Sequence, residues 1–183
     1  MTRFIEHKEN YSLVVEKLQS PDLLNTGLWM VLAGINEIPP HIALINNGKY
    51  YSISARKIEV GEPIEKFLKA ISRRTLPTVF VGIKPGNEDI EQELREAFSH
   101  YPTLGNGEHS CLWPVRDFFA KAFSPEYASC SLVFELLAIT QQQGLLIDCK
   151  ALFDEGDGSQ LSLPKYSVAQ IREKINSILT LKN

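Results

Sequence analysis

The sequence contains only three cysteines in 183 residues, Cys111, Cys130 and Cys149. Small secreted domains that depend on disulfides need a denser cysteine framework than this. The first ten residues are rich in charge and include no apolar stretch of the kind found in a signal peptide. We therefore expect a cytoplasmic protein with free thiols.

The sequence also lacks any apolar run close to the roughly 20 residues that a membrane-spanning helix requires. It has no excess of basic charge, because 19 Lys and Arg residues stand against 22 Asp and Glu residues, for a formal net charge of −3. A protein that binds nucleic acid through its phosphates presents a basic face. These absences argue against a transmembrane segment and against a nucleic-acid partner.

The composition that remains is that of a globular chain, with 44% hydrophobic and 22% charged residues. A chain of this length can bury a substantial core. We find no internal repeat and no compositional boundary, so the sequence predicts a single domain over residues 1–183. The softest segment is the acidic, glycine- and serine-rich stretch 154–164, which we expect to be a flexible loop before a C-terminal helix.

The clearest local signal is a β-hairpin over residues 41–54. Asn47-Gly48 separates two apolar runs and suits the positive φ angles of a two-residue turn. In the register that this turn sets, Leu44 pairs with Tyr51, and His41 pairs with Ser54. Alternation then places His41 on a face of mixed polarity, across from a more apolar face that we expect to be core.

Hydrophobic spacing elsewhere predicts roughly four strands and five or six helices. Helical spacing is found at 11–18, 64–71, 90–98, 114–123, 126–142 and 168–178, and short apolar or β-branched runs predict further strands at 28–33, 78–83 and 145–149. This mixture predicts the α+β class. We expect a small, mainly antiparallel sheet built round the 41–54 hairpin and packed by these helices.

The segment 104–123 carries the strongest chemical signal. A polar, glycine-broken loop leads into an amphipathic helix, and Cys111 lies at or just before the start of that helix. Unpaired amides and the positive end of the helix dipole favour a thiolate at such a position. Cys111 is therefore a candidate nucleophile, and the alternative is a small, buried and inert cysteine.

His41 is the candidate base for Cys111. It opens a strand on a face of mixed polarity, and the hairpin register offers Ser54 or Ser52 on the next strand to orient its ring. His109, two residues before Cys111, is a less favourable base because a turn holds the two side chains awkwardly. The candidate catalytic set is Cys111, His41 and Ser54.

This order of residues resembles the circularly permuted papain-like cysteine hydrolases. Two segments resemble that group: the strand and turn from His41 to Tyr51 and, after a long gap, the segment Asn106-Gly-Glu-His-Ser-Cys111 before a helix. The group includes relatives of lecithin retinol acyltransferase and the PPPDE-type isopeptidases. In it a histidine opens a strand, a polar residue lies on the next strand, and the cysteine follows later at the start of a helix. The resemblance implies Cys111 as nucleophile and His41 as base.

Two alignments of this resemblance remain open. The acyltransferase signature Asn-Cys-Glu-His places Gly107 at the position of the nucleophile, which would make the chain inactive. With Cys111 as the nucleophile, the Asn-Gly-Glu-His match is accidental. The two alignments correspond to the two functions that we consider.

The first function is a thiol hydrolase or acyltransferase that cleaves amide or thioester bonds of a peptide, protein or acyl substrate. The second is a non-catalytic protein-interaction domain, a degenerate relative of such enzymes. Neither needs a cofactor. A metal site at His109, Cys111, His100 and Glu108 is disfavoured, because zinc sites usually show two tight ligand pairs.

Overall fold

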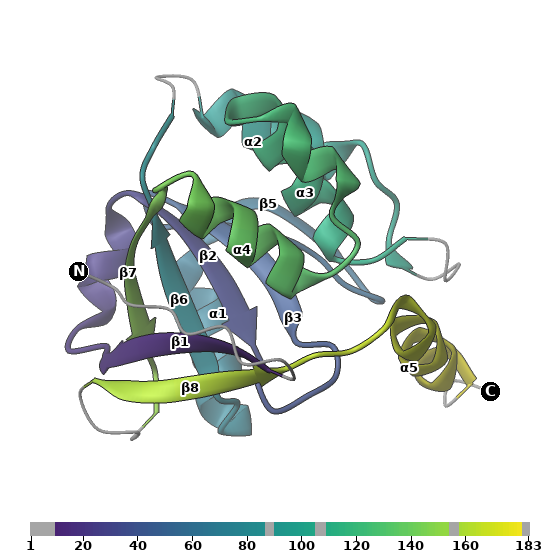
Figure 1. The fold of residues 1–183 in the computed structure, drawn as a ribbon, viewed down its shortest axis with the longest axis horizontal. Helices are drawn as coiled ribbons and strands as arrows, with labels where there is room; N and C mark the ends of the chain where they lie inside the picture. The colour runs from purple at the N-terminus through teal and green to yellow at the C-terminus, as the bar shows by residue number, and fades with distance from the viewer. Residues whose placement is uncertain (1–9, 87–89, 105–108, 154–157, 181–183) are drawn as a thin grey trace.

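The chain folds around one eight-stranded, largely antiparallel sheet, as the computed structural model in Figure 1 shows. The structure describes residues 10–86, 90–104, 109–153 and 158–180. The strand order across the sheet is β5-β4-β3-β2-β6-β7-β1-β8. The predicted α+β class is confirmed, since the sheet is mostly antiparallel and helices pack against it.

The elements run in the following order along the described residues. The strands are β1 (Asn10–Lys17), β2 (Leu28–Ala33), β3 (His41–Asn46), β4 (Lys49–Ile53), β5 (Ile58–Pro63), β6 (Thr78–Ile83), β7 (Leu146–Ala151) and β8 (Ser159–Pro164). The helices are α1 (Ile64–Arg74), α2 (Ile90–Ser99), α3 (Leu112–Ala122), α4 (Val133–Gln142) and α5 (Val168–Thr180), with 3-10 turns η1 (Pro21–Asn25) and η3 (Pro125–Ser129).

The centre of the sheet is the pair of strands β2 and β6, not the hairpin. All six residues of each strand are buried, which explains why both read as short continuous apolar runs. Most neighbouring strands pair antiparallel, and β1 pairs parallel with β7. The prediction of a mainly antiparallel sheet is confirmed, whereas a small sheet built round the 41–54 hairpin is wrong, because the hairpin occupies one side of a wider sheet.

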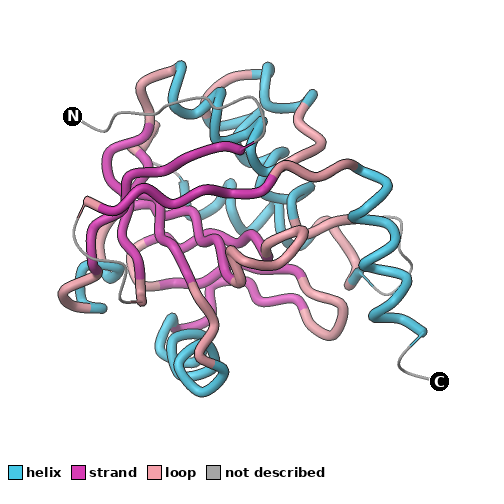
Figure 2. Tube along the Cα trace, turned by 60° about the horizontal axis from the view of Figure 1, so that its bottom comes forward, coloured by secondary structure: helices cyan, strands magenta, loops and turns pink. Residues whose placement is uncertain are grey.

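Helices cover both faces of this sheet. Figure 1 shows α2, α3 and α4 on one face and α1 behind the strands, and Figure 2 shows a lone helix beneath the strands with the others above. The two faces form separate cores: Ile42, Leu44 and Tyr51 contribute to the core under α2, α3 and α4, and Ala43 and Ile45 to the core under α1. The hairpin face expected to be mixed is therefore mostly buried as well.

The first element was predicted wrongly, as a helix over 11–18, where the structure has strand β1. The buried apolar side chains of β1 are Tyr11, Leu13 and Val15, which alternate along a strand, and Val14 is only half-buried. β-branched residues at 14 and 15 also suit a strand better than a helix. The helical spacing was a coincidence within a short window.

Two other segments, 154–164 and 126–142, differ from the prediction in their secondary structure. Residues 159–164 of the expected loop form the edge strand β8, in which Leu161 and Leu163 alternate with polar residues. The remaining positions 154–157 lie outside the described residues. The single helix expected over 126–142 is divided into η3 and α4, and Glu135 accepts hydrogen bonds from the Ser131 and Leu132 amides where α4 begins.

The hairpin turn forms as predicted, but its ladder is short. Asn46 pairs with Lys49 and Leu44 with Tyr51, in the expected register. The expected pairing of His41 with Ser54 is not made, because the ladder between β3 and β4 ends at Leu44 and the two strands separate beyond it.

None of the helices among the described residues is long and apolar enough to cross a bilayer. The longest, α5, has 13 residues, whereas a span needs about 20.

Candidate functional site

The separated ends of β3 and β4 open onto a cavity of about 330 Å³. His41 contributes from the start of β3 and Cys111 from the start of α3, so the two residues that the sequence predicts as a pair line the same cavity. Ile171 and Ile175 of α5 form part of the opposite wall. No local pattern predicts that α5 lies here, because this contact joins residues about 60 or more positions apart.

Cys111 occupies the N-cap position of α3, as the sequence predicts. Pro114 lies in the first turn, where a missing N–H costs no hydrogen bond. The backbone amides of Ile42, Cys111 and Leu112 act to lower the pKa of the Cys111 thiol. Burial raises that pKa by more, so the net shift is upward and the expected thiolate is not the resting form.

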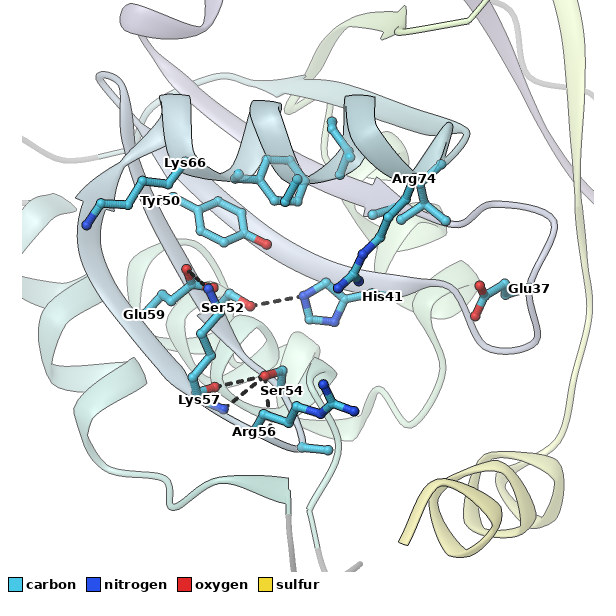
Figure 3. Close-up of a pocket in the computed structure, with 16 residues that line it drawn as sticks. Glu37, His41, Tyr50, Ser52, Ser54, Arg56, Lys57, Glu59, Lys66 and Arg74 are labelled. Carbon is cyan, nitrogen blue, oxygen red and sulfur yellow. Dashed lines mark hydrogen bonds and ion pairs between the residues drawn. The ribbon is translucent and has the colours of Figure 1, made fainter. Parts of the chain in front are cut away.

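His41 is fixed by one side-chain hydrogen bond. Its ring Nε2 lies 3.0 Å from Ser52 Oγ, and Figure 3 shows the ring beside that hydroxyl. Burial lowers the pKa of His41 to about 4. The imidazole is therefore neutral near pH 7. In the tautomer whose Nε2–H donates to Ser52 Oγ, Nδ1 is the nitrogen that can accept a proton.

Ser54, the predicted orienting residue, has a different set of partners. Its hydroxyl donates to the carbonyl of Lys57 at 3.1 Å and accepts from the Arg56 and Lys57 amides at 3.3 and 3.1 Å. These bonds hold the turn between β4 and β5. Ser54 still lines the cavity, but the His41 ring contacts Ser52, the other serine that the register offered.

The Cys111 sulfur and the His41 ring approach the cavity from different sides of the sheet. Cys111 packs against the core under α2, α3 and α4, whereas Ser52, to which His41 bonds, lies with Tyr50 on the face under α1. No hydrogen bond joins the thiol to the ring within the part of the chain that the structure describes. Because β3 lies between these two faces, direct proton transfer would require the two side chains to move toward one side of the strand.

His109, the less favourable base, is held by aromatic packing. The centroid of its ring lies 4.9 Å from that of Trp113 and 5.5 Å from that of Tyr101, and both contacts are edge-to-face. Within the described residues no group of three or more His, Cys, Asp or Glu side chains is placed to hold a metal ion. Glu108, together with Asn106 and Gly107 of the signature, lies outside the described residues.

The other two cysteines differ sharply from Cys111 in their surroundings. Cys130 is 2% exposed and Cys149 is 1% exposed, whereas Cys111 is partly exposed at the cavity. Burial raises the pKa of Cys130 to about 11 and that of Cys149 to about 12. Among the three thiols, only Cys111 combines access with a neighbouring base.

A second, larger cavity of about 670 Å³ meets the first at His41. It lies between α1 and the β3–β4 hairpin, and Figure 3 shows the side chains that line it. Arg74, at the end of α1, lines both cavities. The sequence alone favours a solvated charge at this residue, since nothing in a helix-terminal Arg-Arg pair distinguishes one arginine from the next.

Comparison of the chain with protein-family models, with curated proteins and with solved structures found no match.

Proposed function

We propose that this protein is a thiol-dependent hydrolase or acyltransferase that acts on amide or thioester bonds. Cys111 is the nucleophile, His41 is the base, and Ser52 orients the His41 ring. The observation that carries the proposal is the shared cavity, which is lined both by Cys111, half-buried at a helix N-terminus, and by a neutral, hydrogen-bonded imidazole.

The proposed reaction starts from the neutral pair. Nδ1 of His41 takes the proton of the Cys111 thiol as the sulfur attacks the substrate carbonyl carbon, and a tetrahedral intermediate forms. The bond to the leaving nitrogen or sulfur then breaks, and the leaving group takes the proton from the imidazolium. A water, or another acceptor nucleophile, then gives its proton to His41 as it attacks the thioester carbonyl. The C–S bond breaks, the acyl group is released, and the imidazolium returns its proton to the sulfur, which restores the thiol.

The raised pKa of Cys111 decides between two forms of this mechanism. In a preformed ion pair the thiol would be ionised before substrate binds. Here burial favours the thiol, and the low pKa of His41 keeps the imidazole neutral. Both shifts support general-base catalysis, in which the proton moves only as the sulfur attacks. The Cys111 and Leu112 amides at the start of α3, which face the sulfur, are suitable donors to the developing oxyanion.

The test is acyl transfer to the protein from phenyl thioacetate. We expect one acetyl group on Cys111, located by mass spectrometry, with release of thiophenol. A Cys111→Ser variant should form no thioester at this position. In His41→Gln, acetylation of Cys111 should be slower than in the wild type by about 10²-fold or more. The matched control is Cys130→Ser, which should behave as the wild type. Absence of the acetyl group, or equal acetylation of all three cysteines, would contradict the proposal.

The second candidate is the non-catalytic interaction domain. It is favoured by the missing hydrogen bond between the thiol and the imidazole and by the upward shift of the Cys111 pKa. It predicts that His41→Gln leaves the rate of acetylation at Cys111 unchanged, so the same experiment separates the two functions.

A further inference from the structure

The larger cavity has an apolar floor beside the candidate catalytic histidine. Tyr50 and Phe67 stack there with ring centroids 4.4 Å apart, and Ala70, Ile71 and Leu76 complete the lining from α1 and the segment after it. The cavity joins the smaller one at His41, so an occupant of the larger cavity lies next to the proposed reaction centre. Its volume is in the range of small-molecule sites.

Most charged side chains around this cavity are already paired. Lys57 bonds Glu59 at 2.5 Å, and Lys66 bonds Glu62 at 2.6 Å. Glu37 lies 4.0 Å from Lys174 of α5. These three contacts account for the lysines and carboxylates that line the larger cavity.

Arg56 and Arg74 remain without a carboxylate partner among the described residues, and both line the cavity. In Figure 3, Arg74 extends from α1 toward His41, and Arg56 extends from the turn after β4 on the other side of the ring. The chain as a whole carries a net charge of −3. Two unpaired guanidinium groups at one concave, apolar-floored site are therefore a local departure from the overall charge.

We infer that the larger cavity binds the part of the substrate that carries an oxyanion, with an apolar group on the Tyr50–Phe67 floor and the anion held by Arg74 and Arg56. The chemical class is a carboxylate or a phosphate attached to an apolar group, since guanidinium binds both through paired N–H donors. This inference rests on the proposed function for the link to catalysis, because it places that anion beside His41, the proposed base.

The direct test is equilibrium binding of three probes of similar shape to the full chain: phenylacetate, phenyl phosphate and the neutral phenylacetamide. We expect at least one of the two anions to bind with an affinity about tenfold higher than that of phenylacetamide, or more. The anion that binds more tightly shows whether the site prefers a carboxylate or a phosphate. Chemical shifts of the Arg74 and Arg56 side-chain N–H groups should move on titration. Equal affinity for the anionic and neutral probes would overturn the inference.

The variants are Arg74→Gln and Arg56→Gln, with Arg73→Gln as the matched control. Arg73 is the neighbouring arginine on the last turn of α1 and does not line either cavity. We expect Arg74→Gln to lower the affinity for the anion about tenfold and leave that for phenylacetamide unchanged. Equal losses in Arg74→Gln and Arg73→Gln would show only a general charge effect and would contradict the site.

The link to the reaction centre is tested separately with iodoacetate and its neutral analogue iodoacetamide. Arg74→Gln should lower the rate of Cys111 alkylation by iodoacetate severalfold more than the rate with iodoacetamide. Probe binding that depends on Arg74, without acetylation of Cys111 by phenyl thioacetate, would leave the anion site standing and overturn the proposed function. Acetylation of Cys111 together with equal binding of the anionic and neutral probes would leave the proposed function standing and overturn the anion site.

Discussion

The burial of His41 determines both its proposed role as a base and the response of the fold to acid. Burial moves its pKa to about 4, from a usual value of 6.5, so folding favours the neutral ring over most of the physiological range. A neutral ring with one nitrogen bound to Ser52 can accept a proton at the other. The same burial makes the folded state sensitive to acid.

Stability should therefore fall on acidification through His41. The unfolded chain binds a proton near pH 6.5 and the folded chain near pH 4, so the contribution is complete above 6.5 and is lost as the pH falls toward 4. The loss has an upper bound of about 3 kcal/mol. Urea unfolding between pH 7 and 4 should show a smaller decrease for His41→Gln than for the wild type. Equal decreases would contradict a buried neutral imidazole.

The two serines near His41 should have different effects on acetylation of Cys111. Ser52→Ala removes the hydrogen bond to the ring, and a neutral bond of about 1 kcal/mol corresponds to roughly a fivefold slower reaction. Ser54→Ala should leave the rate close to that of the wild type, because its hydroxyl bonds the turn backbone. Phenyl thioacetate kinetics at pH 7 measure both rates. A larger effect of Ser54→Ala would restore Ser54 as the orienting residue.

At the scale of elements, the proposed site depends on where β3 and β4 separate. Their ladder ends at Leu44 and Tyr51, and α3 places Cys111 within hydrogen-bond reach of the Ile42 amide. The far wall comes from α5, whose Ile171 is only 8% exposed. A helix from the other end of the chain thus limits access to the thiol.

Shortening the wall that α5 provides should expose Cys111. Ile171→Ala is expected to raise the rate of Cys111 alkylation by iodoacetamide severalfold, at a stability cost of roughly 2 kcal/mol or more. Val168→Ala is the control, because Val168 lies on the same helix, is 40% exposed and does not line the cavity. An unchanged rate in Ile171→Ala would mean that α5 does not restrict the reagent.

Elements with strong local signals could be predicted from the sequence, and elements set by distant contacts could not. The Asn47-Gly48 turn, the apolar runs of β2 and β6 and the spacing of α2 and α5 each identified their elements. The strand β1 was mistaken for a helix because its pairing partners, β7 and β8, lie more than 120 residues away. No short window contains that information.

The residues of the proposed site were likewise predictable where a local pattern marks them, and not where distant contacts decide. Cys111 at a helix start and His41 at a strand start were visible as local patterns, and both reach one cavity. The choice between Ser52 and Ser54 was not visible, because it depends on where the ladder opens. The sign of the Cys111 pKa shift also depended on burial by distant segments, which outweighs the helix terminus.

For the whole molecule, the continuous sheet joins the two cores into one structure. Phe80 on β6 is fully buried under α1, in the middle of the strand order. Its truncation should weaken the entire domain and not one edge. The predicted single domain over residues 1–183 can be tested in this way.

Phe80→Ala should lower the free energy of unfolding by about 3–5 kcal/mol. Circular dichroism and tryptophan fluorescence should report one coincident transition in urea. Ile147→Ala on β7, where the side chain is 59% exposed, should change stability by less than about 0.5 kcal/mol. Two separate transitions would contradict a single cooperative domain.

The most direct measurement of the central claim is the rate of alkylation of each cysteine by iodoacetamide near neutral pH, in the wild type and in His41→Gln. The account predicts that Cys111 reacts much faster than Cys130 and Cys149 and that His41→Gln slows Cys111 alone. Equal rates for the three thiols, or a Cys111 rate that does not depend on His41, would contradict a reactive pair at the shared cavity.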